Sequence, residues 1–176
     1  MKKISAYEIA LSAIACALAT IALTVGILVP GLQITGYLVA YFALMIPLAK
    51  KCYWGDLLAY IGASVLSLLF TGILIWDVLP FIVFFGLHPL ANALQEKTKI
   101  HRFLARAIKA IWFDVAAYLV WRFVFGMNTQ FEFVDKYIIL IILVGGTIFF
   151  FAYDYLFTLC QKATDALVNR FFGKKK

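Results

Sequence analysis

Long apolar runs alternate with short polar segments along the whole chain. Six runs can be read, at residues 4–28, 32–49, 54–70, 73–93, 104–125 and 136–159. A helix that crosses the hydrocarbon core of a bilayer needs about 20 apolar residues, at a rise of about 1.5 Å each. The pattern therefore predicts an all-α integral membrane protein in which six transmembrane helices form a single compact bundle.

The segments between the runs differ in length and polarity. Pro30-Gly31 and Thr71-Gly72 are short, uncharged breaks and predict tight turns. The connections at 95–102 and 126–135 are longer and more polar. After the last run, residues 160–176 predict a short amphipathic helix that forms a separate cytoplasmic tail.

Basic residues fall on alternate connections. All but two of the 16 lysines and arginines lie before the first run, after the second, around the fourth-to-fifth connection, or after the sixth; the exceptions are Arg122 and Lys136. Cytoplasmic loops of membrane proteins carry an excess of such residues. We therefore expect both termini in the cytoplasm of a multi-pass protein of the cell membrane.

Composition supports this assignment and excludes other classes. A chain of 176 residues that is 65% hydrophobic has too much apolar surface for a soluble core of this size. The net charge of +7 lies at predicted helix ends, where it faces anionic lipid headgroups, and this placement argues against nucleic-acid binding. Cys16, Cys52 and Cys160 have no C-x-x-C spacing and are expected to be packing residues rather than disulfide or metal sites.

The first twenty residues are similar to a secretory signal, with two lysines before an apolar stretch. Two features favour a retained first helix instead. The apolar run continues to Val29, and Glu8 interrupts the part that would be the signal's apolar core.

Polar side chains inside a predicted span are costly, so each needs a partner, a cavity or a role. His88, Asp114 and Asp154 lie deep in the fourth, fifth and sixth runs and are predicted to form a buried polar cluster. Two interpretations remain open for His88: a packing contact between helices, or a ligand or proton-relay role.

A second layer lies near the outer ends of the same runs. The residues predicted to line a pocket there, which suits a flat, polar small molecule, are Trp76, Asp77, Trp121, Arg122, Asn128 and Gln130. Simpler explanations also exist. Asp77 suits a helix start whatever else it does, and Arg122 is long enough to reach the outer headgroups.

The chain lacks the motifs of the common enzyme and nucleotide sites. No H-E-x-x-H pair, G-x-S-x-G elbow, P-loop or clustered Cys/His spacing is present, so we expect no enzyme, no cofactor and no metal. Active transport would then need a partner that supplies energy. The first run carries Ala6-x-x-x-Ala10, Ala13-x-x-x-Ala17 and Ala15-x-x-x-Ala19, a small-residue surface that another helix can approach closely.

These features together resemble the S components of energy-coupling factor (ECF) vitamin transporters, which are small six-helix substrate-binding subunits without an ATPase. The resemblance implies that Ala13 and Ala17, with Ala6, Ala10, Ala15 and Ala19 as alternates, contact a transmembrane coupling subunit driven by two ATPase subunits. It also implies a pocket for a vitamin or precursor formed by Trp76, Asp77, Phe81, Trp121, Arg122 and Asn128. The chain departs from the family in a short 30–33 loop and in a deep charged cluster, and its 84–89 segment matches no vitamin-binding signature.

Two other classes stay open. One is a structural membrane protein similar to MreD, in which the polar cluster only specifies packing. The other is a self-sufficient small transporter that uses His88 and the buried carboxylates as a proton or cation path.

Overall fold

The computed structural model describes residues 5–98, 101–126 and 131–172, and all of its regular secondary structure over these ranges is helical. The elements are α1 (Ala6–Leu28), α2 (Gln33–Leu48), α3 (Tyr53–Phe70), α4 (Ile75–Pro80), the π-helix η1 (Phe81–Phe85), α5 (His88–Thr98), α6 (Arg102–Phe123), α7 (Glu132–Leu140), the π-helix η2 (Ile141–Gly146) and α8 (Thr147–Phe172).

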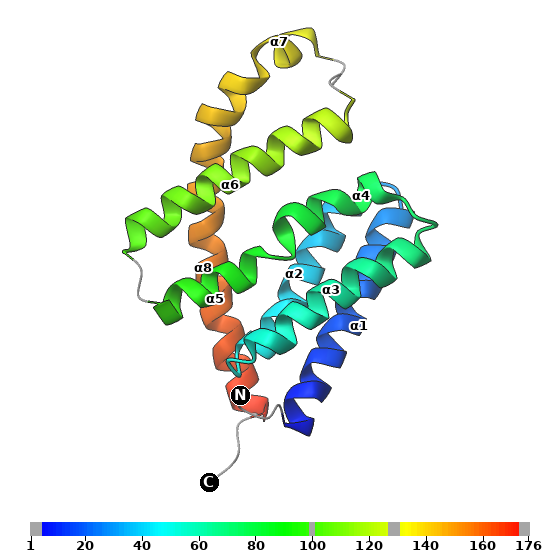
Figure 1. Cartoon of the computed structure of the whole chain (residues 1–176), viewed down its shortest axis with the longest axis vertical. Coiled ribbons are helices and arrows are strands. Elements are labelled where there is room, and N and C mark those ends of the chain that lie inside the picture. Colours follow the sequence, from blue (N-terminus) through cyan, green and yellow to red (C-terminus); the bar gives the residue numbers. More distant parts are fainter. Residues whose placement is uncertain (1–4, 99–100, 127–130, 173–176) are drawn as a thin grey trace.

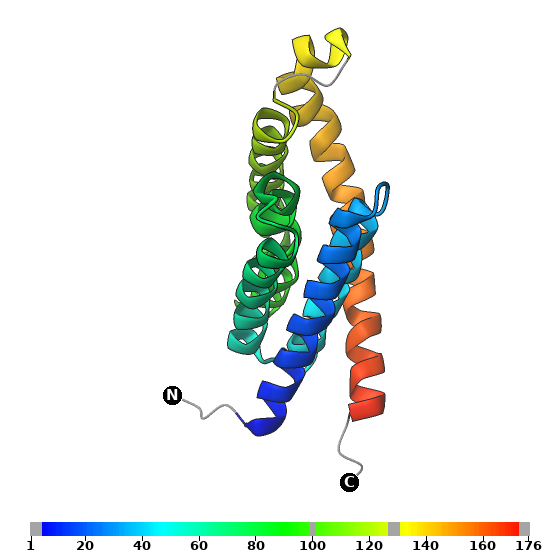
Figure 2. The same ribbon diagram turned by 90° about the vertical axis from the view of Figure 1, so that its right-hand side faces the viewer.

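The helices form two layers, seen edge-on in Figure 2. One layer holds α1, α2 and α8, and the other holds α3, α4, η1, α5 and α6. The start of α1 and the end of α8 lie at the same end of the molecule, and α7 lies at the opposite end (Figure 1).

Four stretches of the described chain are long and apolar enough to cross a membrane: Ala6–Leu28, Tyr53–Phe70, Ile75–Thr98 and Glu132–Arg170. The sequence predicted six. The helix Gln33–Leu48 is apolar but has 16 residues, which span about 24 Å of a hydrocarbon core of about 30 Å. The sixth candidate, α6, carries five charged side chains along its 22 residues.

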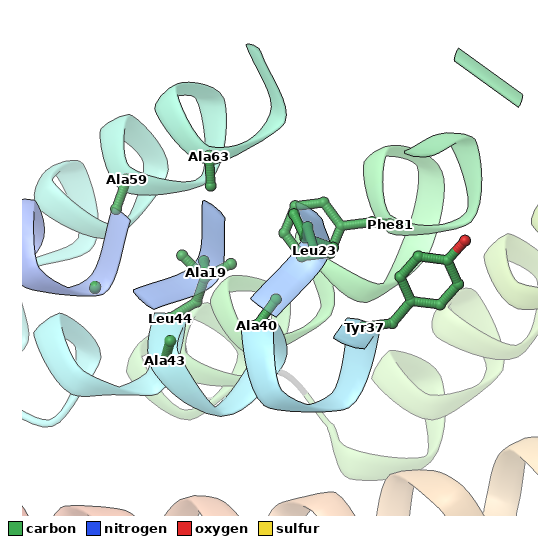
Figure 3. Close-up of a cluster of buried hydrophobic side chains, with 10 residues drawn as sticks. Ala19, Leu23, Tyr37, Ala40, Ala43, Leu44, Ala59, Ala63 and Phe81 are labelled. Carbon is green, nitrogen blue, oxygen red and sulfur yellow. The ribbon is translucent and has the colours of Figure 1, made fainter. Parts of the chain in front are cut away.

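Small residues bring α1, α2 and α3 close together. A Cβ atom on Gly26 would lie 2.7 Å from the Cα atom of Gly36, so the α1 and α2 backbones are nearly in contact there. Alanines from the three helices face one another in the main hydrophobic core (Figure 3). This core contains Ala15, Ala19, Leu23, Tyr37, Ala40, Ala43, Leu44, Ala59, Ala63 and Phe81.

The predicted fourth span, 73–93, is not one straight helix. Pro80 has no N–H to donate to the preceding turn. After it the α-helix changes to the wider π-helix η1, in which the Gly86 N–H donates to the Phe81 carbonyl at 2.8 Å. A turn at Gly86 and Leu87 then leads into α5, which begins at His88 with Pro89 in its first turn.

Three aromatic side chains from other helices donate to carbonyls of this broken segment. The Tyr37 hydroxyl on α2 donates to the carbonyl of Asp77. The Tyr60 hydroxyl on α3 donates to the Ile82 carbonyl at 2.8 Å, and Trp112 Nε1 on α6 donates to the Val83 carbonyl at 2.9 Å. Such donors allow a helix to break inside an apolar environment without leaving backbone groups unpaired.

The end of the chain also differs from the prediction. The sequence predicted a separate amphipathic tail from residue 160, whereas α8 continues without a break from Thr147 to Phe172. The physical reason lies in the sequence, because this stretch contains neither glycine nor proline.

Candidate functional site

A buried polar network joins three helices of the two layers. Lys109 on α6 forms an ion pair and hydrogen bond with Asp154 Oδ1 on α8. His88 on α5 places its Nε2 atom 3.4 Å from the same oxygen, which is long for a hydrogen bond. All three side chains are buried, with exposed fractions of 6% for Lys109, 1% for Asp154 and 0% for His88.

Further polar groups surround this centre. The Tyr41 hydroxyl on α2 lies 3.0 Å from His88 Nδ1, and Lys109 Nζ donates to Asn92 Oδ1 at 2.7 Å. Arg106 Nε approaches Asp154 Oδ2 at 3.5 Å from a partly exposed position. If Tyr41 donates to Nδ1, the ring proton of His88 lies on Nε2 and faces the Asp154 carboxylate.

The network holds helices together through charge. A buried ion pair stabilises a fold only when the pair is complete, and an unpaired buried charge costs several kcal/mol. The Lys109–Asp154 pair therefore fixes α6 against α8, while His88 and Asn92 attach α5 to both.

The structure brings together two of the three residues predicted for the buried cluster. His88 and Asp154 are neighbours, but the Asp114 carboxylate instead accepts a hydrogen bond from Thr147 Oγ1 at 3.1 Å. Thr147 precedes Asp154 by seven residues on α8, so the two acids lie about 10 Å apart along the helix axis.

Sequence reasoning missed Lys109. It was counted among the basic residues at the cytoplasmic edge, yet it is buried in the bundle and is the main partner of Asp154. The signal was available, because Lys109 lies five residues inside the predicted 104–125 span and a deep carboxylate requires a cation.

Sequence reasoning also missed Asp56. This side chain is fully buried in the first turn of α3, and neither of its carboxylate oxygens has a hydrogen-bond partner in the described part of the chain. An ionised carboxylate without a partner at such a position costs several kcal/mol.

A cavity of about 280 Å³ lies beside the broken segment. Apart from the indole of Trp121, its side chains are all apolar: Pro80, Val83, Phe84 and Phe85 from the break, Phe113, Ala116, Ala117, Val120, Trp121 and Phe125 from α6 and its end, and Ile138 from α7. Phe84 also packs on His88, with ring centroids 5.2 Å apart. Phe84 therefore contacts both the cavity and the His88 side of the polar network.

The residues predicted for the outer pocket are dispersed. Only Trp121 lines the cavity, and its Nε1 donates to Asp135 Oδ1 at 3.1 Å. Trp76 stacks on Phe123 with centroids 5.5 Å apart, and the Arg122 guanidinium lies over that same ring.

The other three predicted residues have separate positions. Asp77 accepts a hydrogen bond from Gln33 Nε2 at 3.2 Å, and Phe81 is buried in the main core. Asn128, like Gln130, lies outside the described residues. Phe81 packs in the main core whereas Trp121 lines the cavity, so the structure does not bring these two predicted residues together.

The alanines of α1 divide between two faces. Ala6, Ala10, Ala13 and Ala17 are exposed, whereas Ala15 and Ala19 are buried in the core. Beside Ala13, a shallow groove of about 230 Å³ runs between α1 and α3. It is lined by Ile9, Ser12, Ala13, Cys16, Gly55, Leu58 and Ala59.

Comparison with known proteins assigns no family. The chain matches no family model, no curated protein and no solved structure.

The site's chemistry follows from its side chains. No group of three His, Cys, Asp or Glu residues in the described ranges is arranged to hold a metal ion. The cavity offers aromatic and aliphatic surface, and the network beneath it offers an imidazole beside an ion pair. Such a site can bind a small molecule with an apolar body, or exchange protons in the bundle interior.

Proposed function

We propose that this chain is a membrane-embedded, substrate-binding subunit for uptake of a small micronutrient. It crosses the bilayer six times with both termini in the cytoplasm, and a separate module of a coupling subunit and two ATPases supplies the energy. The observation that carries the proposal is the exposed small-residue groove between α1 and α3, next to Ala13.

This groove suits a partner helix. Association of helices in a bilayer depends on close packing, and small side chains allow it. The buried Ala15 and Ala19 belong to the core, so the exposed Ala13 and Ala17 remain available on the outer face of the same helix.

The substrate pocket in this proposal is the cavity beside the broken helix. Its lining favours a ligand with a flat aromatic or apolar body, because only Trp121 among the lining side chains carries a polar atom. The polar network beneath Phe84 holds the floor of the pocket in place.

The pocket predicts a ligand that the purified protein retains. Mass spectrometry of small molecules released from the denatured protein is expected to find one compound with an aromatic or apolar body. Trp121→Ala removes the largest lining side chain and should reduce its retention at least about tenfold, a loss of about 1.4 kcal/mol.

Trp54→Ala is the matched control, because Trp54 is 70% exposed and does not line the cavity. Repeated absence of any ligand, or equal loss in both variants, would contradict the proposed pocket.

If a partner helix docks in this groove, bulky side chains introduced there should prevent the association. Tagged protein isolated from its own host should carry a second membrane subunit, two nucleotide-binding subunits and ATPase activity. Ala13→Trp with Ala17→Trp should remove all three, because each indole fills the space that a helix needs.

Ile148→Trp on α8 serves as the control, since Ile148 is 67% exposed on a different helix. Association that persists in the variant with Ala13→Trp and Ala17→Trp would contradict the proposed docking surface.

The buried network favours one second candidate, a self-sufficient proton-coupled transporter. His88 lies beside the Lys109–Asp154 pair, an arrangement that can take up and release a proton. Uptake by the protein alone in liposomes, abolished by Asp154→Asn, would favour this candidate over the ATPase-driven one.

A further inference from the structure

A polar cavity of about 580 Å³ lies at the end of the molecule where α2 ends and α3 begins. The turn after α2, the last turns of α5 and the last turns of α8 enclose it. Its lining is Leu48, Ala49, Lys51, Tyr53, Ala93, Glu96, Lys97, Gln161, Asp165 and Asn169. It lies apart from both the apolar cavity and the buried network, so neither proposed role uses it.

Charges of both signs surround this cavity. Lys51 and Lys97 contribute ammonium groups to its lining, Glu96 and Asp165 contribute carboxylates, and Lys50 Nζ donates to the lining Asn169 Oδ1 at 2.8 Å. Within the described ranges, no ion pair closer than 4 Å joins any two of the four groups of Lys51, Lys97, Glu96 and Asp165. Lys97 instead lies over the Tyr53 ring, with Nζ 4.7 Å from its centroid.

Two side chains at the cavity carry polar atoms that have no hydrogen-bond partner in the described ranges. Oδ1 of Asp165 is inaccessible to solvent and has no hydrogen-bond partner in the described part of the chain. Gln161 is only 6% exposed and lines the cavity, and no hydrogen bond of its amide is found among the described residues. Buried polar groups are normally hydrogen-bonded, so these two indicate a missing polar ligand.

The start of α3 adds donors on the same side. The N-cap residue Cys52 makes no side-chain capping hydrogen bond, and Tyr53 in the first turn lines the cavity. Uncapped N–H groups at a helix start favour an anionic group nearby.

From this geometry we infer that the cavity binds a zwitterion in which a primary ammonium and a phosphate lie a few bonds apart, the phosphoethanolamine group. The ammonium lies between Glu96 and Asp165, and the phosphate lies between Lys51 and Lys97. A purely anionic ligand would meet two carboxylates and a metal cation would meet two ammonium groups, so a ligand with both charges fits best.

The ligand has two sources, a membrane lipid headgroup and a free phosphoethanolamine ester. The cavity lies at the ends of apolar helices, where headgroups are found if the chain crosses a bilayer as proposed. The inference rests on that embedding and not on the uptake function, so the two can fail separately.

Lipid competition tests the inference on the wild-type protein. The full-length chain is incorporated in nanodiscs with equal amounts of phosphatidylethanolamine, phosphatidylcholine and phosphatidylglycerol, and bound lipid is counted by native mass spectrometry after release. Phosphatidylcholine keeps the phosphate but has no N–H donors, and phosphatidylglycerol has no ammonium. Phosphatidylethanolamine should be retained about tenfold more than either.

Single substitutions then assign the preference to this cavity. Asp165→Asn and Lys97→Gln should each abolish it, whereas Lys162→Gln, on the exposed side of the same helix, should leave it intact. Equal retention of the three lipids, a preference for phosphatidylglycerol, or a preference that survives Asp165→Asn would overturn the inference.

A water-soluble ligand distinguishes the lipid headgroup from the free ester. Glycerophosphoethanolamine is added to protein in phosphatidylcholine nanodiscs, and the unfolding temperature is measured. An increase that Asp165→Asn removes supports a free ester, and lipid retention without this increase supports the headgroup. Absence of both effects contradicts the site.

Discussion

At the scale of single residues, the pairing of Lys109 with Asp154 dominates the bundle interior. Both side chains are almost completely buried, and each provides the countercharge of the other. Arg106 reaches the second oxygen of Asp154 from a more exposed position. The loss of either member of the pair therefore has a larger consequence than the loss of a typical surface charge.

Substitution of Asp154 tests this view. Asp154→Leu should lower the free energy of unfolding by about 3–5 kcal/mol, because Lys109 is left buried without its carboxylate. The double variant Asp154→Leu with Lys109→Met should recover much of that loss, since no unpaired charge remains. Thermal unfolding in detergent, followed by intrinsic fluorescence, measures both.

Asp114→Leu is the comparison variant, because Asp114 bonds to Thr147 and no ion pair of its carboxylate is found in the described part of the chain. A double variant as unstable as the Asp154 single variant would contradict the paired-charge explanation.

Residue-level prediction from sequence was partial for a definable reason. His88 and Asp154 are unusual in apolar runs, and their presence there already implies a buried partner. Lys109 lies near the start of its run, where a base is also expected at a membrane surface. The depth of Asp154 in its own run requires a cation nearby, and the packing of α6 against α8 identifies Lys109 as that cation.

At the scale of elements, the close crossing of α1 and α2 depends on two glycines. Gly26 and Gly36 meet backbone to backbone, with no space for a methyl group between them. This crossing positions the helix that carries both the core alanines and the exposed Ala13 and Ala17.

The crossing predicts a sharp cost for one added methyl group. A Cβ atom on Gly36 would lie 2.7 Å from the Ala22 carbonyl oxygen, so Gly36→Ala should destabilise the protein by about 1–3 kcal/mol. Gly145→Ala is the control, because nothing lies within 4 Å of its Cβ position. Equal unfolding temperatures for the two variants would show that the helices separate without cost.

Helix positions were largely predictable, but the shape of the fourth span was not. Apolar runs locate α1, α2 and α3 to within about one or two residues of their ends. In the fourth run, Pro80 and Gly86 lie amid strongly apolar sequence, and hydropathy alone cannot distinguish a straight helix from a broken one. The break persists because Tyr37, Tyr60 and Trp112 donate to its carbonyls, and those contacts come from other helices.

At the scale of the whole molecule, the two ends of the helical layers differ in character. The end with the start of α1 and the end of α8 carries Lys50, Lys51 and Lys97, whereas glycine turns at Gly31 and Gly72 lie at the other end. This difference matches the charge asymmetry of the sequence and defines the expected orientation.

Orientation can be measured by cysteine labelling. In a variant without native cysteines, Lys51→Cys and Arg170→Cys should react with a membrane-impermeant thiol reagent only after the cells are opened. Gly31→Cys and Gly72→Cys should react in intact cells. The opposite pattern would reverse the orientation, and reaction of all four in intact cells would contradict membrane crossing.

The uninterrupted course of α8 has a mechanical consequence. Three residues of this one helix take part in three different contacts. Thr147 bonds to Asp114, Asp154 pairs with Lys109, and Asp165 lines the polar cavity. Because one continuous helix carries all three positions, a rotation of α8 about its own axis would turn Thr147, Asp154 and Asp165 together.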